Sequence, residues 1–147
     1  MQLIELKTNN DSRGSLTAIE AASNIPFEIK RCYLLHHLVA ARGGHAHRDT
    51  QQLVISASGS INIRLSDGLV SKSYSLDTPT FGLLINPMTW IEIPEFSTGA
   101  VVVVLASTHY DHRRTIRMWG EFLNEKKTRW NALIHRLCSS KHDKLIV

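Results

Sequence analysis

The chain lacks the marks of several specialised protein classes. It has only two cysteines in 147 residues, Cys32 and Cys138, and they lie far apart, so no disulfide framework is indicated. No apolar run approaches the ~18 residues of a membrane span, and the longest, residues 100–106, suits a buried strand. The first ten residues lack the basic and apolar run of a signal peptide. We therefore expect a cytoplasmic protein with two free thiols.

Aromatic residues are also sparse, at 7% of the chain, and no nucleic-acid-binding module is present. The formal net charge is +4, with the excess concentrated from Arg113 onward. A basic balance allows an anionic ligand, but a solvated C-terminal helix accounts for it equally well. We expect neither a nucleic acid nor a membrane as a partner. The length suits a single domain with a substantial core.

Residues 1–112 have the pattern of a β-protein. Short runs rich in Ile, Val, Leu and Thr alternate with turn residues, and Asp67-Gly68 is typical of a hairpin. The expected strands are 2–7, 15–20, 29–38, 52–58, 60–65, 70–76, 81–85, 89–93 and 100–106. The segments Asn9-Asn10-Asp11 and 41–44 interrupt them as breaks. Many short strands at regular spacing predict a β-sandwich or barrel.

Residues 113–147 differ, and we expect them to form a helical extension of the same domain. Between Arg113 and Cys138 apolar residues recur at helical spacing, which predicts one long helix or two shorter ones. These residues are Ile116, Trp119, Phe122, Leu123, Trp130, Leu133, Ile134 and Leu137. We expect them to pack against the barrel or a second subunit, and residues 139–147 to fray.

The segment Arg42-Gly43-Gly44-His45-Ala46-His47 contains the chemically informative residues. On a strand, residues i and i+2 point to one face, so His45 and His47 project together, with Cα atoms roughly 6–7 Å apart. Two imidazoles in the interior of a small barrel are unusual, because apolar side chains normally fill it.

Three interpretations of the two histidines compete. They are surface or hydrogen-bonded residues, or ligands of a metal, or an acid–base pair. His-x-His also opens the metal-binding cupin pattern, but here Gln52 stands where that pattern has a carboxylate, and only Glu92 could complete the site. An imidazole titrates near pH ~6.5 and exchanges protons at neutral pH, and Arg42 adds a cation for a phosphate or an oxyanion.

A set of further segments occurs in a fixed order around this motif. They are DSRGSL at 11–16, IPF at 25–27, IKRCY at 29–33, RGGHAH at 42–47, DG at 67–68, Pro87, Trp90, VLAS at 104–107 and YD at 110–111. As a group they resemble the WxcM-like (FdtA-like) cupins, the nucleotide-sugar 3,4-ketoisomerases. The resemblance covers residues 3–125, and residues 128–147 extend beyond the usual end of the family.

The resemblance implies an all-β cupin barrel of the jelly-roll type with a C-terminal helical tail. It implies a substrate, dTDP-4-keto-6-deoxyglucose, whose ketone moves from C4 to C3 through an enediolate without a cofactor or a metal. It further implies a homodimer with exchanged N-terminal strands, and a role in making 3-amino-3,6-dideoxy sugars for surface polysaccharide.

The same resemblance suggests residue roles. His45 is the expected base for the C3 proton, His47 its acid or relay partner, and Tyr33 a hydroxyl donor. The expected substrate-binding residues are Arg42 beside the sugar, Arg13 and Arg64 at the diphosphate, Trp90 stacked on the sugar or base, and Gln52. For Tyr33 and Trp90 the alternative is packing in the core, and for Arg64 it is an exposed strand position.

One departure from the family pattern concerns the sugar. Ile91 follows Trp90 where relatives often carry a polar residue, and it leaves open the configuration at C4 of the product. Three alternatives to the ketoisomerase also stay open: a nucleotide-sugar 3,5-epimerase on the same barrel, a non-catalytic cupin that binds a sugar nucleotide, and a metal-dependent cupin.

Overall fold

The computed structural model describes residues 1–21 and 23–142, with side chains as far as residue 136. The strands are β1 (Gln2–Glu5), β2 (Thr8–Asp11), β3 (Gly14–Thr17), β4 (Arg31–Leu35), β5 (Arg42–His47), β6 (Gln52–Ser58), β7 (Ile61–Ser66), β8 (Ser71–Leu76), β9 (Phe81–Ile85), β10 (Trp90–Phe96), β11 (Val101–Ala106) and β12 (Thr115–Ile116). A 3₁₀ turn, η1 (His112–Arg114), precedes β12, and one long helix, α1 (Trp119–His142), ends the described chain.

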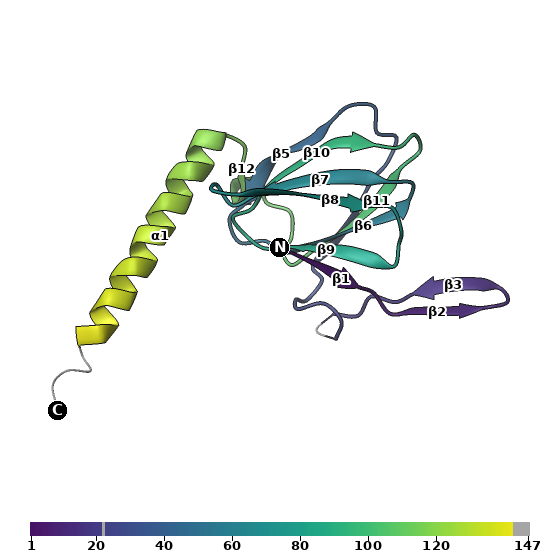
Figure 1. Ribbon diagram of the computed structural model, residues 1–147, viewed down its shortest axis with the longest axis horizontal. Helices are drawn as coiled ribbons and strands as arrows, with labels where there is room; N and C mark the ends of the chain where they lie inside the picture. The colour runs from purple at the N-terminus through teal and green to yellow at the C-terminus, as the bar shows by residue number, and fades with distance from the viewer. Residues whose placement is uncertain (22, 143–147) are drawn as a thin grey trace.

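Two five-stranded antiparallel sheets face each other (Figure 1). One has the strand order β1-β9-β6-β11-β4 and the other the order β12-β5-β10-β7-β8. Neighbouring strands alternate between distant parts of the sequence, as in a jelly roll. The prediction of an all-β cupin barrel with a helical tail is therefore confirmed. The β7–β8 hairpin forms where expected, with Asp67 Oδ1 accepting hydrogen bonds from the amides of Leu69 and Val70, both at 2.9 Å.

Alternating apolar residues of both sheets build the core between them. The buried members are Val54, Ile61, Ile63, Leu65, Leu76, Leu83, Ile85, Ile91, Ile93, Ala100, Val102 and Val104. A second cluster, which includes Leu6, Ile25 and Phe27, covers the outer face of the β6 sheet with residues from the segment before β4. Because both faces of this sheet are covered, β6 is buried from Gln52 to Ser56, and its centre, residues 53–55, is a continuous apolar run.

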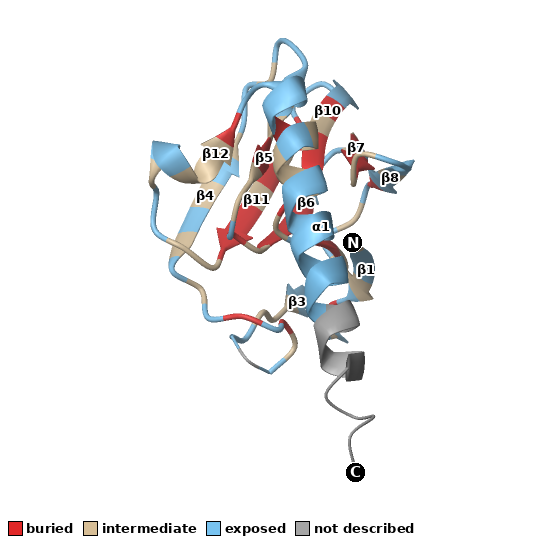
Figure 2. Ribbon diagram, turned by 90° about the vertical axis from the view of Figure 1, so that its left-hand side faces the viewer, coloured by how far each residue is buried: buried red, intermediate tan, exposed pale blue. Residues whose placement is uncertain are grey.

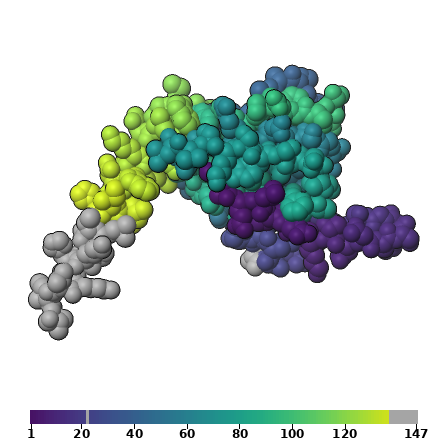
Figure 3. All heavy atoms as spheres, in the orientation of Figure 1, coloured from purple at the N-terminus to yellow at the C-terminus, as the bar shows by residue number. Residues whose placement is uncertain are grey.

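The N-terminal region departs from the prediction. Residues Asn9 to Asp11 were expected to break the chain, but they belong to β2, which pairs with β3 as a separate hairpin. This hairpin stands out from the barrel, and almost all of its residues are exposed (Figures 1 and 3). A two-stranded ribbon without a buried face produces no apolar alternation, so the sequence pattern did not reveal it.

The C-terminal region contains the expected helix, but its predicted start at Arg113 was wrong. Residues 115–116 instead pair with β5 as β12, and α1 begins at Trp119. Phe122 is fully buried with Trp90 and Ile116 on the outer face of the β5 sheet, so the first turns of α1 do pack against the barrel. Figure 2 shows the following turns, as far as residue 136, mostly exposed.

The apolar stripe farther along α1 lies in solvent within this chain. Trp130, Leu133 and Ile134 are 62%, 50% and 45% exposed, so they do not pack on the barrel as the first turns do. The thiol of Cys32 is free and exposed, whereas the side chain of Cys138 and the predicted frayed end, residues 139–147, lie outside the described side chains. In the described part of the chain, no helix is both long and apolar enough to cross a membrane.

Candidate functional site

A cavity of about 660 Å³ opens between the two sheets. Its lining comes from β4, β5, β6, β7, β10, β11 and the segments around β12. The lining residues are Arg31, Tyr33, Leu35, Ala41, Arg42, Gly43, His45, His47, Gln52, Val54, Ile63, Ile91, Ile93, Val104, Tyr110, Thr115 and Arg117. Five of the eight site residues predicted from the sequence lie here together: His45, His47, Tyr33, Arg42 and Gln52.

The two histidines of β5 project into this cavity from one face of the strand, as their spacing predicts. Pairing fixes the strand on both sides, with His45 opposite Ile91 of β10 and His47 opposite Thr115 of β12. Thr115 Oγ1 lies 3.4 Å from His47 Nδ1. The Nδ1 of His45 and the Nε2 of His47 are buried without a hydrogen-bond partner in the protein.

A bulge in β5 explains how Arg42 reaches the same cavity. Arg42 lies three residues before His45, so a regular strand would turn it to the opposite face. The pairing skips Gly44, however, because Gly43 stands opposite Glu92 and Arg42 opposite Ile93. Gly43 has a φ of +93° and Gly44 one of +64°, both in the region that favours glycine. The two glycines thus restore the orientation of Arg42.

The facing wall of the cavity is β4, with Arg31 and Tyr33 on its inner side. The Tyr33 hydroxyl accepts a hydrogen bond from Gln52 Nε2 at 2.8 Å. The Arg31 guanidinium carbon lies 5.0 Å from the ring centroid of Tyr33 and 5.4 Å from that of Tyr110. Arg31 is therefore held by two aromatic faces, and its Nε is buried without a hydrogen-bond partner.

The charge of the cavity is positive. Arg31, Arg42 and Arg117 line it, and among the described residues of the lining none carries a carboxylate. Burial lowers the pKa of His45, a backbone hydrogen bond with Gly43 acts against that shift, and Arg117 adds a smaller lowering. Burial, His45, Arg31 and Arg117 together lower the pKa of His47 to about 4. Both imidazoles are consequently neutral at pH 7 and able to accept a proton.

The pKa of Tyr33 is raised, whereas those of the two histidines are lowered. Burial raises the pKa of its phenol, although Arg31 and the hydrogen bond from Gln52 act against that rise. The phenol therefore stays protonated at neutral pH. Because Gln52 donates to the Tyr33 oxygen, the hydroxyl hydrogen of Tyr33 is left to donate elsewhere. The site thus combines two proton acceptors, one hydroxyl donor and fixed cations for an anionic ligand.

Two predicted substrate-binding residues do not lie in this cavity. Arg64 of β7 and Trp90 of β10 face the outer side of the sheet. Arg64 is paired with Glu92 at 2.7 Å, and Trp90 packs on Trp119 and Phe122 of α1 at ring-centroid distances of 5.2 and 5.6 Å. Strand alternation gives the reason, since Ile91 faces inward and its neighbour Trp90 must then face outward.

Arg13 is also remote from the cavity of its own chain. It lies in the turn between β2 and β3, 88% exposed, with its guanidinium bound to Asp11. The hairpin extends away from the barrel, so Arg13 does not contact the cavity of its own chain (Figure 1). Its predicted contact with the diphosphate would need the hairpin to reach another subunit.

Four polar side chains of the lining were given no role from the sequence: Arg31, Tyr110, Thr115 and Arg117. Arg31 shares the face of Tyr33 two residues later, so strand alternation could have found it. Thr115 and Arg117 were hidden because their segment was assigned to the helix. Tyr110 follows β11 in a loop, where no periodicity places a side chain.

A metal bound by His45 and His47 would need at least one further protein ligand. Among the side chains of residues 1–21 and 23–136, no three or more His, Cys, Asp or Glu come together as a ligand group. Glu92, the residue that could have completed a metal site with the two histidines, instead binds Arg64 outside the cavity. Gln52 is engaged with Tyr33. The residues around His45 and His47 therefore do not form the donor set that a cupin metal requires.

Known proteins match this chain over most of its length. A family model described as FdtA: WxcM-like, C-terminal, matches residues 1–127. A TDP-4-oxo-6-deoxy-alpha-D-glucose-3,4-oxoisomerase of Aneurinibacillus thermoaerophilus is 41% identical over 123 residues, which cover 82% of this chain and 88% of the relative.

Solved structures of 3,4-ketoisomerases are similar to this chain in sequence and in fold. A 3,4-ketoisomerase from Helicobacter canadensis has 41% identity and a TM-score of 0.83, over 86% of this chain and 96% of its own. QdtA, a sugar 3,4-ketoisomerase from Thermoanaerobacterium thermosaccharolyticum solved with TDP, has 38% identity and a TM-score of 0.84, over 87% of this chain and 95% of its own.

Proposed function

The chain belongs to the FdtA family, WxcM-like, C-terminal, and on that premise we propose that it is a 3,4-ketoisomerase that converts TDP-4-keto-6-deoxyglucose to the 3-keto isomer. The relatives named above are 3,4-ketoisomerases or a 3,4-oxoisomerase, at 38–41% identity over most of the chain, and one is named for TDP-4-oxo-6-deoxyglucose. They favour the predicted ketoisomerase over the 3,5-epimerase alternative.

The single observation that supports this reaction best is the neutral histidine pair inside a cationic cavity. A ketone at C4 acidifies the C–H bond at C3, and a neutral imidazole can remove that proton. The bond electrons then form a C3–C4 double bond and leave negative charge on O4, where positive groups stabilise it. His45 and His47, with pKa values below their ordinary range, suit the first step.

The second half of the reaction returns the protons to new positions. C4 receives a proton, and the O3 hydroxyl proton leaves as O4 gains one, so the carbonyl ends at C3. We assign the C3 proton to His45, and the transfer between oxygens to His47 together with the Tyr33 hydroxyl. Gln52 orients Tyr33 through its hydrogen bond, and Arg42 holds the substrate at the mouth of the cavity.

The assembly and setting of the enzyme are part of the same proposal. We propose a homodimer in which the β2–β3 hairpins are exchanged, because the hairpin leaves its own barrel and Leu16 on it is 61% exposed. Exchange would bring Arg13 to the partner's substrate. Action in the cytoplasm, on sugars destined for surface polysaccharide, also stays a proposal. Light scattering of the intact chain and of an 8–17 deletion would measure the change in mass.

The decisive experiment locates the carbonyl of the product. The protein is incubated with TDP-4-keto-6-deoxyglucose in heavy water, and the sugar is followed by NMR. A 3-keto product carrying deuterium at C4 supports the proposal. A product that keeps its C4 carbonyl and exchanges at C3 and C5 would identify an epimerase, and binding without turnover would identify a sugar-nucleotide-binding cupin.

A further inference from the structure

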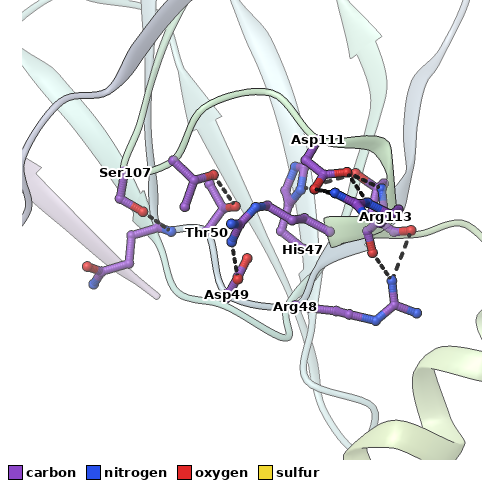
Figure 4. A network of polar contacts seen from close by, with 11 residues as sticks. His47, Arg48, Asp49, Thr50, Ser107, Asp111 and Arg113 are labelled. Atoms are coloured by element: carbon purple, nitrogen blue, oxygen red, sulfur yellow. Dashed lines mark hydrogen bonds and ion pairs between the residues drawn. The ribbon is translucent and has the colours of Figure 1, made fainter.

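Arg48 follows His47 directly, but its side chain leaves the cavity and joins three parts of the fold. Its guanidinium donates to both α1 carboxylates within reach, Glu121 Oε1 at 2.6 Å and Glu125 Oε1 at 2.6 Å. The same group donates to the backbone oxygen of Arg113 at 2.5 Å and, more weakly, to that of Thr115 at 3.5 Å. Figure 4 shows the side chain extending from the end of β5 to these backbone oxygens.

The backbone strengthens this link. The amide of Arg48 donates to the carbonyl of Arg114 at 2.8 Å, and Asp49 forms an ion pair with the Arg114 side chain. Residues 113–115 are thus bound to residues 48–49 by main chain and side chain together. A bidentate guanidinium has a fixed fork geometry, so Arg48 sets the distance between β5, β12 and α1 more closely than a flexible ammonium would.

The segment held by Arg48 carries two residues of the cavity wall. Thr115 stands opposite His47 and lies 3.4 Å from its Nδ1, and Arg117, two residues on, lines the same cavity. Ile116 between them points to the other side and is fully buried near Phe122. β12 has only two residues paired with β5, so few ladder hydrogen bonds hold this wall in place.

We propose that Arg48 is a positioning residue of the ketoisomerase site, which holds Thr115 and Arg117 against His47 by tying β12 and α1 to the end of β5. The inference rests on the proposed function, because it assigns a role within that site. It also makes the first turns of α1 part of the machinery, through Glu121 and Glu125, rather than a mere cover for the barrel.

The groups that line the cavity with His47 determine how movement of the β12 segment would change its pKa. They are His45 and Arg42 of β5, Arg31 and Tyr33 of β4, Tyr110 after β11, and Thr115 and Arg117 of the β12 segment. Of these, only Thr115 and Arg117 are held by Arg48. Retreat of Arg117 removes a positive charge from His47, and a wider mouth admits water, so the imidazole becomes easier to protonate.

The experiment compares Arg48→Met with Arg113→Met in the full chain. Arg113 is the matched control, because its 79% exposed side chain binds only Asp111 while its backbone oxygen remains available to Arg48. The pKa of His47 is measured by NMR in the ligand-free protein, well below the melting temperature. We expect that pKa to rise in Arg48→Met and to stay unchanged in Arg113→Met, with kcat/KM falling about 10- to 100-fold only in the former.

A second variant covers the case in which Arg48→Met fails to fold. Glu125→Gln keeps the shape of its partner and should raise the His47 pKa in the same direction by a smaller amount, with Arg48→Lys intermediate in kcat/KM. An unchanged His47 pKa and unchanged kinetics in Arg48→Met, or in Glu125→Gln if the former is unfolded, overturn the inference. Absence of turnover in the unaltered protein would refute the proposed function while leaving the pKa comparison valid.

Discussion

The imidazole rings of His45 and His47 meet edge to face, with centroids 4.9 Å apart and 82° between their planes. Two positive charges at this separation repel each other, which is why a proton on His45 would oppose one on His47. The pair therefore binds a second proton less readily than the first. Such a pair suits a reaction that takes one proton from carbon and later returns one.

His45→Asn should abolish most turnover while leaving the cavity shape intact. Asparagine cannot act as a base at neutral pH, and general acid–base catalysis typically contributes about 10²- to 10⁴-fold, so we expect kcat to fall by that factor. Binding of TDP, measured by calorimetry, should change little, because the arginines remain. His112→Asn, on the exposed η1 turn, is the control. A near-normal rate in His45→Asn would refute the role of His45.

The stability of the protein should fall as the pH drops from about 6.5 to 4. His47 has a folded-state pKa of about 4 against 6.5 when unfolded, so in this window the unfolded chain binds the proton first. Because His47 is partly exposed, we discount the full effect and expect the free energy of unfolding to fall by about 1 kcal/mol between pH 7 and 5. This corresponds to roughly 2–4 °C in Tm. Thermal melts of His47→Asn should show a flatter dependence. If the Tm of the unaltered protein and that of His47→Asn depend on pH in the same way, the lowered pKa of His47 is contradicted.

Gly43→Ala should lower the free energy of unfolding and raise KM more than an ordinary glycine-to-alanine substitution does. A Cβ at this position would lie 2.5 Å from the backbone oxygen of Ile91, and φ is +93°. We expect a loss of about 1–3 kcal/mol in chemical denaturation, together with a raised KM as Arg42 and His45 shift. The control is Gly120→Ala in α1, where nothing lies within 4 Å and helix propensity predicts a gain of up to about 1 kcal/mol.

Arg31→Met and Arg64→Met should affect the kinetics differently, because Arg31 lines the cavity and Arg64 lies on the outer face of its sheet. Arg64 is paired with Glu92 on the outside, and exposed ion pairs contribute about 0.2–1 kcal/mol, so its loss should leave kcat and KM within about 2-fold. Arg31 lies between two tyrosine rings in the cavity, so its removal should raise KM by about 10-fold or more. Equal kinetics of the two variants would contradict this placement.

Local periodicity predicted the parts of the site that lie on regular strands. His45 and His47 share a face because they are two residues apart, and β6 and β9 begin and end where the apolar runs do. The same rule excludes a site that contains both Trp90 and Ile91, since neighbours on a strand face opposite sides. Trp90 lies outside the cavity and packs on α1, and its stacking on the sugar or base stays a prediction.

Other parts depended on tertiary contacts that no local pattern reveals. Arg42 reaches the cavity only because the β5–β10 pairing skips Gly44, and the side of a bulge is set by the partner strand. Thr115 and Ile116 pair with β5, although their spacing to Trp119 looks helical. Arg13 has no partner in the cavity of its own chain, so its role depends on assembly, which the sequence of one chain does not specify.

The cationic lining has a consequence for the order of events. Burial lowers the pKa of His47 most, and the positive charges of His45, Arg31 and Arg117 lower it further. A diphosphate bound beside Arg31 and Arg117 would offset their part of this shift, and that part alone would make His47 a stronger base. By this effect His47 would accept a proton less readily in the empty site than beside a bound diphosphate. Added salt would reduce the difference.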